Sequence, residues 1–460
     1  MNKLSEFNQF RTEYPEFHYY SYKISENNEA VKLEYYFGIP GLAEFHPQLS
    51  LKKKSLKLKS LDSELVQNLV FHIGLVELIS YWKSSCAPKV IVHCGKLNPD
   101  QIAWWKKLYF YGLGELFYTN EIPAEMDTFM NIVCLNDAPE FIYDTLPDDS
   151  SGYIVLIGGG KDSIVTLETL PLDRNRDYCM IVNPKPVTRQ CAELAGFDDE
   201  RVIEIQRTID PELIQLNQRG FINGHTPFST MLAFVSYFVA YLTGQKYTVV
   251  SNESSANESN VCGLKVNHQY SKSFEFEQDF DSYADRYLKA PVKYFSFLRP
   301  LNELQIAKIF ARLEKYHPVF KSCNVGSKGE NWVWCGHCAK CLFAFVILAP
   351  YLYPDKLTQI FGKDLFADET LLPTFLELLG KSDNKPFDCV GTFEEVNFAV
   401  SQTIENLRQT SEELPYLLQY YAKHYELADT SDDITTRYNH ENFLGEAQNT
   451  ALRNEVFRNV

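Results

Sequence analysis

The chain has 460 residues, of which 45% are hydrophobic and 23% charged, a composition typical of a globular protein with two or three domains. Its formal net charge of −16 argues against a nucleic-acid substrate, because proteins that bind nucleic acids present a basic face to the phosphates. Residues 1–17 lack the apolar run of a signal peptide, and the longest apolar stretch, Met231–Leu242, is too short to span a bilayer. We therefore expect a cytoplasmic protein that contacts no membrane, in which the 11 cysteines stay reduced.

The first part of the chain, residues 1–147, predicts an N-terminal α+β domain. In chain order we expect the strands Leu33–Tyr36 and Leu49–Leu58, the helix Leu69–Trp82, the strand Lys89–His93 and the helix Pro99–Tyr111. Along Leu49–Leu58 leucines alternate with lysines, which is typical of a solvated strand face or a protected sheet edge. The same lysines could instead contact an anionic substrate.

The second part, residues 148–345, alternates strands with helices. We expect strands at Tyr153–Ile157, Asp177–Val182, Arg201–Ile205 and Tyr247–Val250, with helices ending at Leu170 and covering Pro227–Leu242. This alternation predicts an α/β fold with a doubly wound parallel sheet, whose ligands bind beyond the carboxyl ends of the strands.

The last part, residues 346–460, predicts a mainly helical region. Residues 425–460 are polar and include Asp429, Asp432 and Asp433. Such a segment is either a loosely packed tail or an arm that contacts a partner, and the sequence does not decide between the two.

A glycine-rich loop follows the predicted strand Tyr153–Ile157. Its residues are Gly158, Gly159, Gly160, Lys161, Asp162 and Ser163, and an apolar helix comes next. Glycines let the backbone approach oxygen atoms closely, and the free N–H groups of a helix start favour phosphate. A Walker loop is excluded, because Val155 stands where it needs glycine and Asp162 follows the lysine. A dinucleotide fingerprint would need glycine in place of Ser163.

Four cysteines form a second strong pattern, spaced as Cys323-x₁₁-Cys335-x₂-Cys338-x₂-Cys341. In a reducing compartment two short spacings of this kind predict a closed tetrahedral zinc site. An iron–sulfur cluster is a rival interpretation, since similar spacings occur there. His317 or His337 could replace one of the sulfurs.

The glycine loop resembles that of the PP-loop ATP pyrophosphatases, whose pattern is Ser-Gly-Gly-x-Asp-Ser, except that Gly158 replaces the leading serine. The resemblance implies a Rossmann-like (HUP-type) fold that uses ATP and Mg²⁺ to adenylate a substrate and releases pyrophosphate. It implies that the loop residues, Lys161 and Ser163 included, hold the phosphates, and that Asn183 lies near the adenine. It also implies that Asn252, Glu253 and Ser254 close the phosphate site, with Glu253 and Asp162 as ligands for Mg²⁺.

A subgroup of that family, the deazaguanine nitrile synthases, is similar at Arg299–Leu304 and at the four cysteines. A closer resemblance is carried by Asn223–Ser229, Val266–Glu277 and Lys385–Thr392. With the loop and the cysteines, these segments resemble the family of ATP-dependent epimerases that convert the terminal L-Glu of UDP-MurNAc-L-Ala-L-Glu into D-Glu. The resemblance implies a UDP-MurNAc-dipeptide substrate, action alongside a muramoyl-L-alanine:L-glutamate ligase, and a UDP-sugar site in the N-terminal domain.

Inversion at Cα needs a base and an acid on opposite faces, or one mobile group. Candidates are His225, His268, Cys262 and Lys272. The histidines could instead bind phosphate or cap a turn, and Cys262 could be a small buried residue. The acidic run Glu275, Glu277, Asp279 and Asp281 either holds Mg²⁺ or is a solvated strand face.

Other functions remain open at this point. A PP-loop amide or nitrile synthase would need an ammonia source, and no glutaminase-type domain is recognisable. A tRNA-modifying enzyme is disfavoured by the net charge of −16. A zinc-stabilised nucleotide-binding protein without activity is disfavoured by the intact Gly159, Gly160, Asp162 and Ser163.

Overall fold

A single sheet runs through the computed structural model, which describes residues 3–144, 148, 150–257, 270–328, 332–382, 385–386, 388–430 and 434–458. The sheet has 11 strands in the order β11-β10-β7-β8-β9-β4-β2-β1-β5-β6, and β3 pairs with β2. The strands are β1 (Glu16–Glu26), β2 (Ala30–Ile39), β3 (Ala43–Phe45), β4 (Gln48–Lys52), β5 (Lys89–Val92), β6 (Asn131–Cys134), β7 (Tyr153–Leu156), β8 (Tyr178–Val182), β9 (Val202–Thr208), β10 (Tyr247–Val250) and β11 (Lys293–Ser296).

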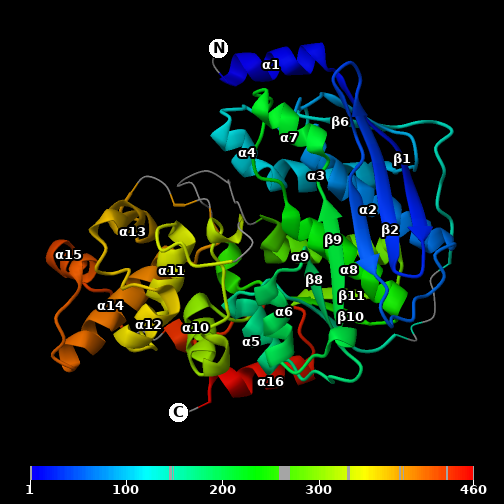
Figure 1. The fold of residues 1–460 in the computed structure, drawn as a ribbon. Coiled ribbons are helices and arrows are strands. Elements are labelled where there is room, and N and C mark those ends of the chain that lie inside the picture. The colour runs from blue at the N-terminus through cyan, green and yellow to red at the C-terminus, as the bar shows by residue number, and fades with distance from the viewer. Residues whose placement is uncertain are drawn as a thin grey trace.

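Helices surround this sheet and fill the C-terminal part of the chain (Figure 1). They are α1 (Lys3–Glu13), α2 (Glu64–Trp82), α3 (Pro99–Gly112), α4 (Gly114–Thr119), α5 (Lys161–Thr169), α6 (Pro186–Leu194), α7 (Pro211–Gln218), α8 (Phe228–Thr243), α9 (Phe274–Tyr283), α10 (Glu303–Ala311), α11 (Ala339–Leu348), α12 (Pro354–Phe361), α13 (Leu372–Leu378), α14 (Phe393–Gln409), α15 (Tyr416–His424) and α16 (Glu446–Val456).

Five neighbouring strands, β11, β10, β7, β8 and β9, are parallel to one another. The alternating pattern predicted four of them, and β11 was not predicted. The N-terminal strands continue the same sheet, because β4 pairs antiparallel with β9. Strands β1, β5 and β6 form a second parallel group, which runs opposite to the first. The α/β prediction is therefore confirmed for a sheet that is mixed rather than wholly parallel. The predicted domain boundary at residue 147 remains a prediction.

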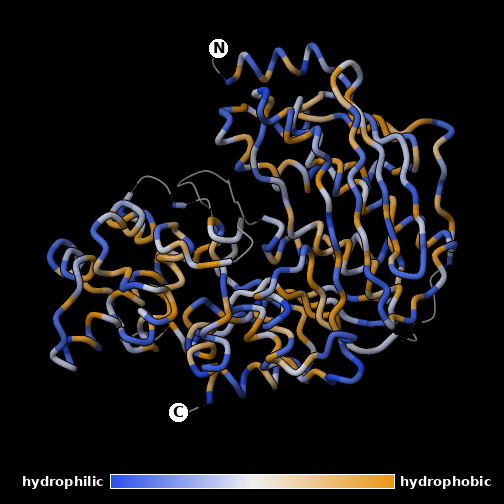
Figure 2. Tube along the Cα trace, viewed as in Figure 1, coloured by the Kyte–Doolittle hydropathy of each residue, from blue (hydrophilic) through white to orange (hydrophobic). Residues whose placement is uncertain are grey.

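Helices cover both faces of the parallel half of the sheet. Apolar residues of α2 and α8 pack with β7 and β10 in one core, while α5, α6 and α10 pack in a second core that extends into α11 and α14. Figure 2 shows the hydrophobic residues along the strands and the helices between them. The C-terminal helices, yellow to red in Figure 1, gather beside α10 and α5 and so reach the glycine loop at the start of α5.

Among the residues that the structure describes, one helix, α2, is long and apolar enough to cross a membrane. However, 94% of its most apolar window is buried inside the protein, where it contacts β1, β2 and α8. Its apolar character is explained by this position in the core.

Two sequence predictions were wrong in detail. The strand predicted at Leu49–Leu58 ends at Lys52, because Lys54 has a positive φ of 40° and the Leu56 N–H bonds back to the Lys53 carbonyl in a turn. Leu49 and Leu51 are buried as the alternation implied.

The acidic run was also misassigned, because it lies on helix α9 and not on a strand. The hydroxyl of Ser273 caps this helix by accepting from the Phe276 N–H. Its carboxylates pair with cations: Asp279 and Glu275 with Lys107, Glu277 with Arg299, and Asp281 with Lys293. These pairs hold α9 against α3 and β11.

Candidate functional site

The glycine loop links the carboxyl end of β7 to the start of α5. Gly160 is the N-cap of α5 and brings no side chain to its first turn, so the N–H groups there are not capped by a side chain. Gly159 has a φ of +81°, a conformation that L side chains rarely adopt. Gly158 faces open space, because a Cβ built there would meet nothing within 4 Å. The loop therefore presents bare backbone to its surroundings.

A cavity of about 440 Å³ opens in front of this loop, at the carboxyl ends of β7, β8 and β10. We call it the loop cavity. It is lined by Leu156, Ile157, Gly158, Gly160, Asp162, Ser163, Met180, Val182, Phe228, Ser229, Leu232, Val250, Ser251, Asn252, Lys272, Lys321, Ser322, Asn324, Trp332, Lys340 and Cys389. Five of the predicted nucleotide-site residues, and Lys272 from the catalytic candidates, thus share one cavity with residues from the last third of the chain.

Other predicted nucleotide-site residues lie close to the loop cavity but do not line it. The Asn183 amide oxygen accepts a 2.7 Å hydrogen bond from the Arg207 N–H, which fixes the turn after β8. The Ser254 hydroxyl donates to the Leu301 carbonyl at 2.9 Å. Gly159 contributes its carbonyl oxygen to a 2.9 Å hydrogen bond from the Lys321 N–H.

Lys161 is buried, and its ammonium contacts the carboxylates of Asp162 and Glu303. Burial alone would lower the pKa of Lys161, but the two carboxylates raise it, so the lysine stays charged. Burial raises the pKa of Glu303 to about 8; Lys161 opposes this rise, while Asp162, Glu253 and Glu395 add to it. A buried group of like charges, held by one lysine, therefore lies directly beneath the loop.

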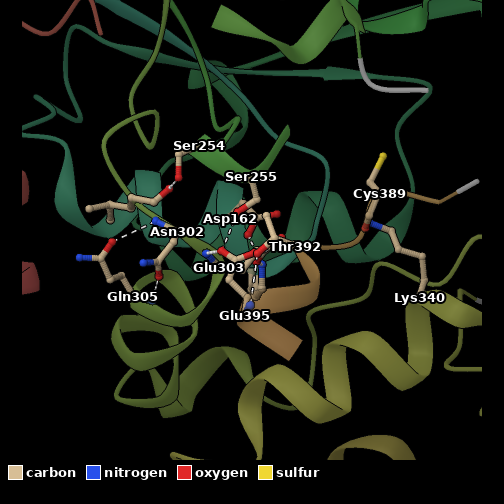
Figure 3. Close-up of polar contacts among 12 residues, drawn as sticks. Asp162, Ser254, Ser255, Asn302, Glu303, Gln305, Lys340, Cys389, Thr392 and Glu395 are labelled. Carbon is tan, nitrogen blue, oxygen red and sulfur yellow. Dashed lines mark hydrogen bonds and ion pairs between the residues drawn. The ribbon is translucent and has the colours of Figure 1, made fainter. Parts of the chain in front are cut away.

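Glu395 connects this buried group to the C-terminal helices. It forms a capping box with Thr392 at the start of α14, and its Oε1 accepts hydrogen bonds from the Ser255 hydroxyl at 2.6 Å and the Glu303 N–H at 2.7 Å (Figure 3). These bonds tie α14, α10 and the segment after β10 together behind the loop. Glu303 and Glu395 were not predicted as site residues. Glu303 lies in the segment Arg299–Leu304, where no role was assigned to it, and Thr392-x₂-Glu395 is the pattern of a helix cap, which does not indicate a site.

Glu253 is 7% exposed, and its carboxylate has no hydrogen-bond or ion-pair partner among the residues that the structure describes. Its carbonyl oxygen accepts a 2.8 Å hydrogen bond from the buried Arg299, which fixes the backbone here. A buried carboxylate without a partner is costly unless a cation binds it. Together with Asp162 in the loop cavity, Glu253 fits the hard oxygen ligands that Mg²⁺ prefers.

Lys272 projects into the loop cavity and donates a 2.8 Å hydrogen bond to the sulfur of Cys389. Burial alone would lower the pKa of Lys272, but Cys389, Glu253 and Asp162 raise it. The Lys340 ammonium donates to the Cys389 carbonyl at 2.7 Å (Figure 3). Cys389, Lys321 and Lys340 were not predicted as site residues, although Cys389 belongs to the quoted segment Lys385–Thr392.

Of the remaining catalytic candidates, His225 is the one that the structure describes. The Nδ1 of His225 lies 3.9 Å from the Glu115 carboxylate, and His225 is not among the residues that line the cavity. Cys262 and His268 lie outside the described residues. Their assignment remains a prediction.

The four predicted cysteines converge, with all their sulfurs within 4.8 Å of one another. Three sulfur pairs are 3.8, 3.7 and 3.5 Å apart, close to the roughly 3.8 Å edge of a tetrahedron with metal–sulfur bonds of about 2.3 Å. The cluster can therefore hold a metal ion. Neither His317 nor His337 joins it in the part of the chain that the structure describes; His317 bonds the Phe310 carbonyl and His337 the Cys335 carbonyl.

Two links join this tetrathiol cluster (Cys323, Cys335, Cys338 and Cys341) to the loop cavity. Trp332 lines the cavity and donates a 2.8 Å hydrogen bond to the Cys323 carbonyl. Lys340 lies between Cys338 and Cys341 at the start of α11 and also lines the cavity. The tetrathiol cluster thus lies next to residues that form one wall of the cavity.

Comparison with known proteins identifies relatives along most of the chain. Residues 8–297 match the family model described as the MurL N-terminal domain, and residues 319–433 match the MurL C-terminal domain. A UDP-N-acetyl-alpha-D-muramoyl-L-alanyl-L-glutamate epimerase from Salinispora tropica is 37% identical over 327 residues, 70% of each chain. The enzyme of the same name from Xanthomonas oryzae pv. oryzae is 34% identical over 346 residues, 74% of this chain and 75% of the relative. No solved structure matches.

Proposed function

This chain belongs to the MurL family, and we propose that it is an ATP- and Mg²⁺-dependent epimerase. Its substrate is UDP-MurNAc-L-Ala-L-Glu, the compound in the names of its relatives, and its product carries D-Glu at the end of the peptide. The observation that carries the ATP-dependent mechanism is the loop cavity, where the bare glycine backbone and the start of α5 meet Asp162, with the buried Glu253 one residue beyond the lining residue Asn252.

The glycine loop is suited to phosphate for two reasons. The uncapped N–H groups at the start of α5 can donate to phosphate oxygens, and the positive end of the helix dipole adds to the attraction. The open space at Gly158 leaves room for a ligand where the PP-loop pattern has serine. This supports a PP-loop ATP site in which Gly158, Gly160 and Ser163 contact the phosphates and Asp162 and Glu253 hold Mg²⁺, which would neutralise phosphate charge.

Adenylation explains why an epimerase would use ATP. The Cα–H of glutamate is a very weak acid beside an ionised carboxylate, because its removal adds charge next to existing charge. An acyl adenylate has no charge on that carboxyl group and withdraws electrons from Cα. A base in the cavity can then remove the proton, return of a proton to the other face inverts the centre, and hydrolysis releases AMP. We place the adenylate on the α-carboxylate for this reason.

The remaining parts of the chain take supporting roles in this proposal. The tetrathiol cluster holds a structural zinc ion, which is supported by the tetrahedral spacing of its sulfurs. The N-terminal part of the sheet binds the UDP-sugar portion. The enzyme works in the cytoplasm after a ligase that attaches L-Glu to UDP-MurNAc-L-Ala.

One incubation tests the proposed function. The protein is mixed with ATP, Mg²⁺ and UDP-MurNAc-L-Ala-L-Glu, and AMP, pyrophosphate and the chirality of the glutamate released by hydrolysis are measured. We expect D-Glu to form only with ATP, together with AMP and pyrophosphate. If AMP formed only with a different carboxylate, and D-Glu never did, the protein would instead be an amide or nitrile synthase or another carboxylate-adenylating enzyme.

A further inference from the structure

We propose that the thiol of Cys389, held by Lys272, is one of the two groups that move the Cα proton. The inference rests on the proposed epimerase function and names a residue that acts in it. It begins from a contact between residues 117 positions apart in the chain, the 2.8 Å hydrogen bond from Lys272 Nζ to Cys389 Sγ.

The position of Cys389 suits a group that reaches an acyl adenylate. Cys389 lines the same cavity as Asp162 and Ser163, which we assign to Mg²⁺ and phosphate. Lys340 holds the Cys389 backbone through its carbonyl oxygen, and Figure 3 shows the sulfur directed away from that contact. The backbone is therefore anchored on one side while the thiol is presented on the other.

The chemistry of the pair suits proton transfer from carbon. A thiolate is the reactive form of cysteine, and a neighbouring ammonium stabilises it. Lys272 supplies that ammonium within hydrogen-bond distance. By contrast, burial raises the thiol pKa of Cys86, Cys94 and Cys191 to about 12, so those cysteines stay protonated near neutrality.

Inversion at Cα then takes two proton transfers, one to Cys389 and one from a second group. The Cys389 thiolate takes the Cα proton, an S–H bond forms, and the electron pair of the Cα–H bond moves into the activated carbonyl as an enolate. A second group on the opposite face then gives a proton to Cα and becomes deprotonated. Exchange of both groups with water restores the starting state.

The test uses Cys389→Ser with Cys389→Ala as a second variant, because serine or alanine cannot form a thiolate. We expect the exchange of labelled pyrophosphate into ATP, in the presence of the substrate, to continue at close to the wild-type rate. Formation of D-Glu should fall by about 100-fold to 10,000-fold, the usual contribution of a general base. Cys191→Ala, which changes a buried cysteine on α6 that does not line the loop cavity, should behave as wild type.

Two results would contradict the role of Cys389, and a third would contradict the proposed function. Normal D-Glu formation by either variant would overturn the assignment of Cys389 to proton transfer. Loss of pyrophosphate exchange in both variants, with exchange intact in the wild type and Cys191→Ala, would overturn it too, because Cys389 would then act in adenylation. Absence of exchange in the wild-type protein would count against the proposed function itself, which separates the two failures.

Discussion

Lys340 donates a 2.7 Å hydrogen bond from its ammonium group to the carbonyl oxygen of Cys389. In the sequence Lys340 stands between Cys338 and Cys341, two cysteines of the tetrathiol cluster. The first turn of α11 therefore contributes to two sites, because Cys338 and Cys341 belong to the tetrathiol cluster and Lys340 lines the loop cavity. A substitution in the tetrathiol cluster should therefore also disturb Lys340 in the loop cavity.

Cys338→Ser tests this coupling. The variant should lose its metal ion and a large part of its stability, because formation of such a site is coupled to folding. D-Glu formation should fall with it, since Lys340 would no longer be held in place. Metal analysis of the purified protein identifies the ion, with zinc expected rather than iron, and thermal unfolding gives the stability. Unchanged metal content and melting temperature would contradict the structural metal site; Cys134→Ser is the control.

Two adjacent glycines give a matched pair of substitutions. Gly159→Ala should destabilise the fold by about 1–2 kcal/mol, because alanine is strained at a φ of +81°. Gly158→Ala, which places its Cβ in open space, should leave the unfolding free energy nearly unchanged. Urea unfolding measures both values. Equal destabilisation by the two variants would show that the loop backbone differs from the one described.

The features that were predicted correctly from the sequence are those formed by residues close together in the chain. The glycine loop and the spaced cysteines are read within short segments, because strand, turn and helix start follow one another and metal ligands recur at fixed intervals. Local patterns also misled. The acidic run recurs with a period of two, which indicates a strand: Glu275, Glu277, Asp279 and Asp281. The segment is nevertheless a helix, because Ser273 caps its start and its carboxylates form ion pairs with Lys107 and Lys293 on different neighbouring elements.

The contacts that complete the candidate site could not be predicted in this way. Lys161 meets Glu303 across 142 positions, and Lys272 meets Cys389 across 117. Glu303 and Cys389 lie in segments that resemble known families, but no fixed spacing links either residue to its lysine. The pairs come together only when the sheet and the C-terminal helices pack. For the same reason the continuation of the sheet from β9 into β4 was not expected.

Glu303 should make stability depend on pH. Its pKa is raised by burial from 4.5 to about 8 in the folded protein, so between these values the folded state binds more protons than the unfolded state. The stability associated with Glu303 is therefore complete below about pH 4.5 and is lost as the pH rises through about 8. When urea unfolding is measured between pH 5 and 9, the free energy of unfolding should fall less with rising pH for Glu303→Gln than for the wild type. Glu193→Gln, at an exposed carboxyl group, should keep the wild-type slope; an equal slope in Glu303→Gln would contradict this prediction.

Ser163→Ala should affect activity without affecting the fold. The Ser163 hydroxyl lines the loop cavity and contacts only the Gly160 carbonyl, at 3.1 Å, among the described residues. We expect it to donate to a phosphate, and loss of a hydrogen bond to a charged group costs about 1.5–3 kcal/mol, or roughly 10-fold to 150-fold in ATP-dependent AMP formation. Steady-state kinetics with varied ATP measure this loss. A normal rate would remove Ser163 from the proposed phosphate site.

Glu253→Gln should separate function from stability. The wild-type carboxylate is buried and forms no hydrogen bond or ion pair among the described residues, and its charge is only partly compensated by Lys272, whose pKa it raises. Replacing it with a neutral amide of the same shape therefore removes the cost of burying that charge. The variant should therefore melt at a temperature equal to or above that of the wild type. Its AMP formation should need a higher Mg²⁺ concentration, because one anionic ligand is lost. A Mg²⁺ titration and a melting curve on the same sample test both effects. A lower melting temperature with an unchanged Mg²⁺ requirement would mean that Glu253 supports the fold rather than the metal.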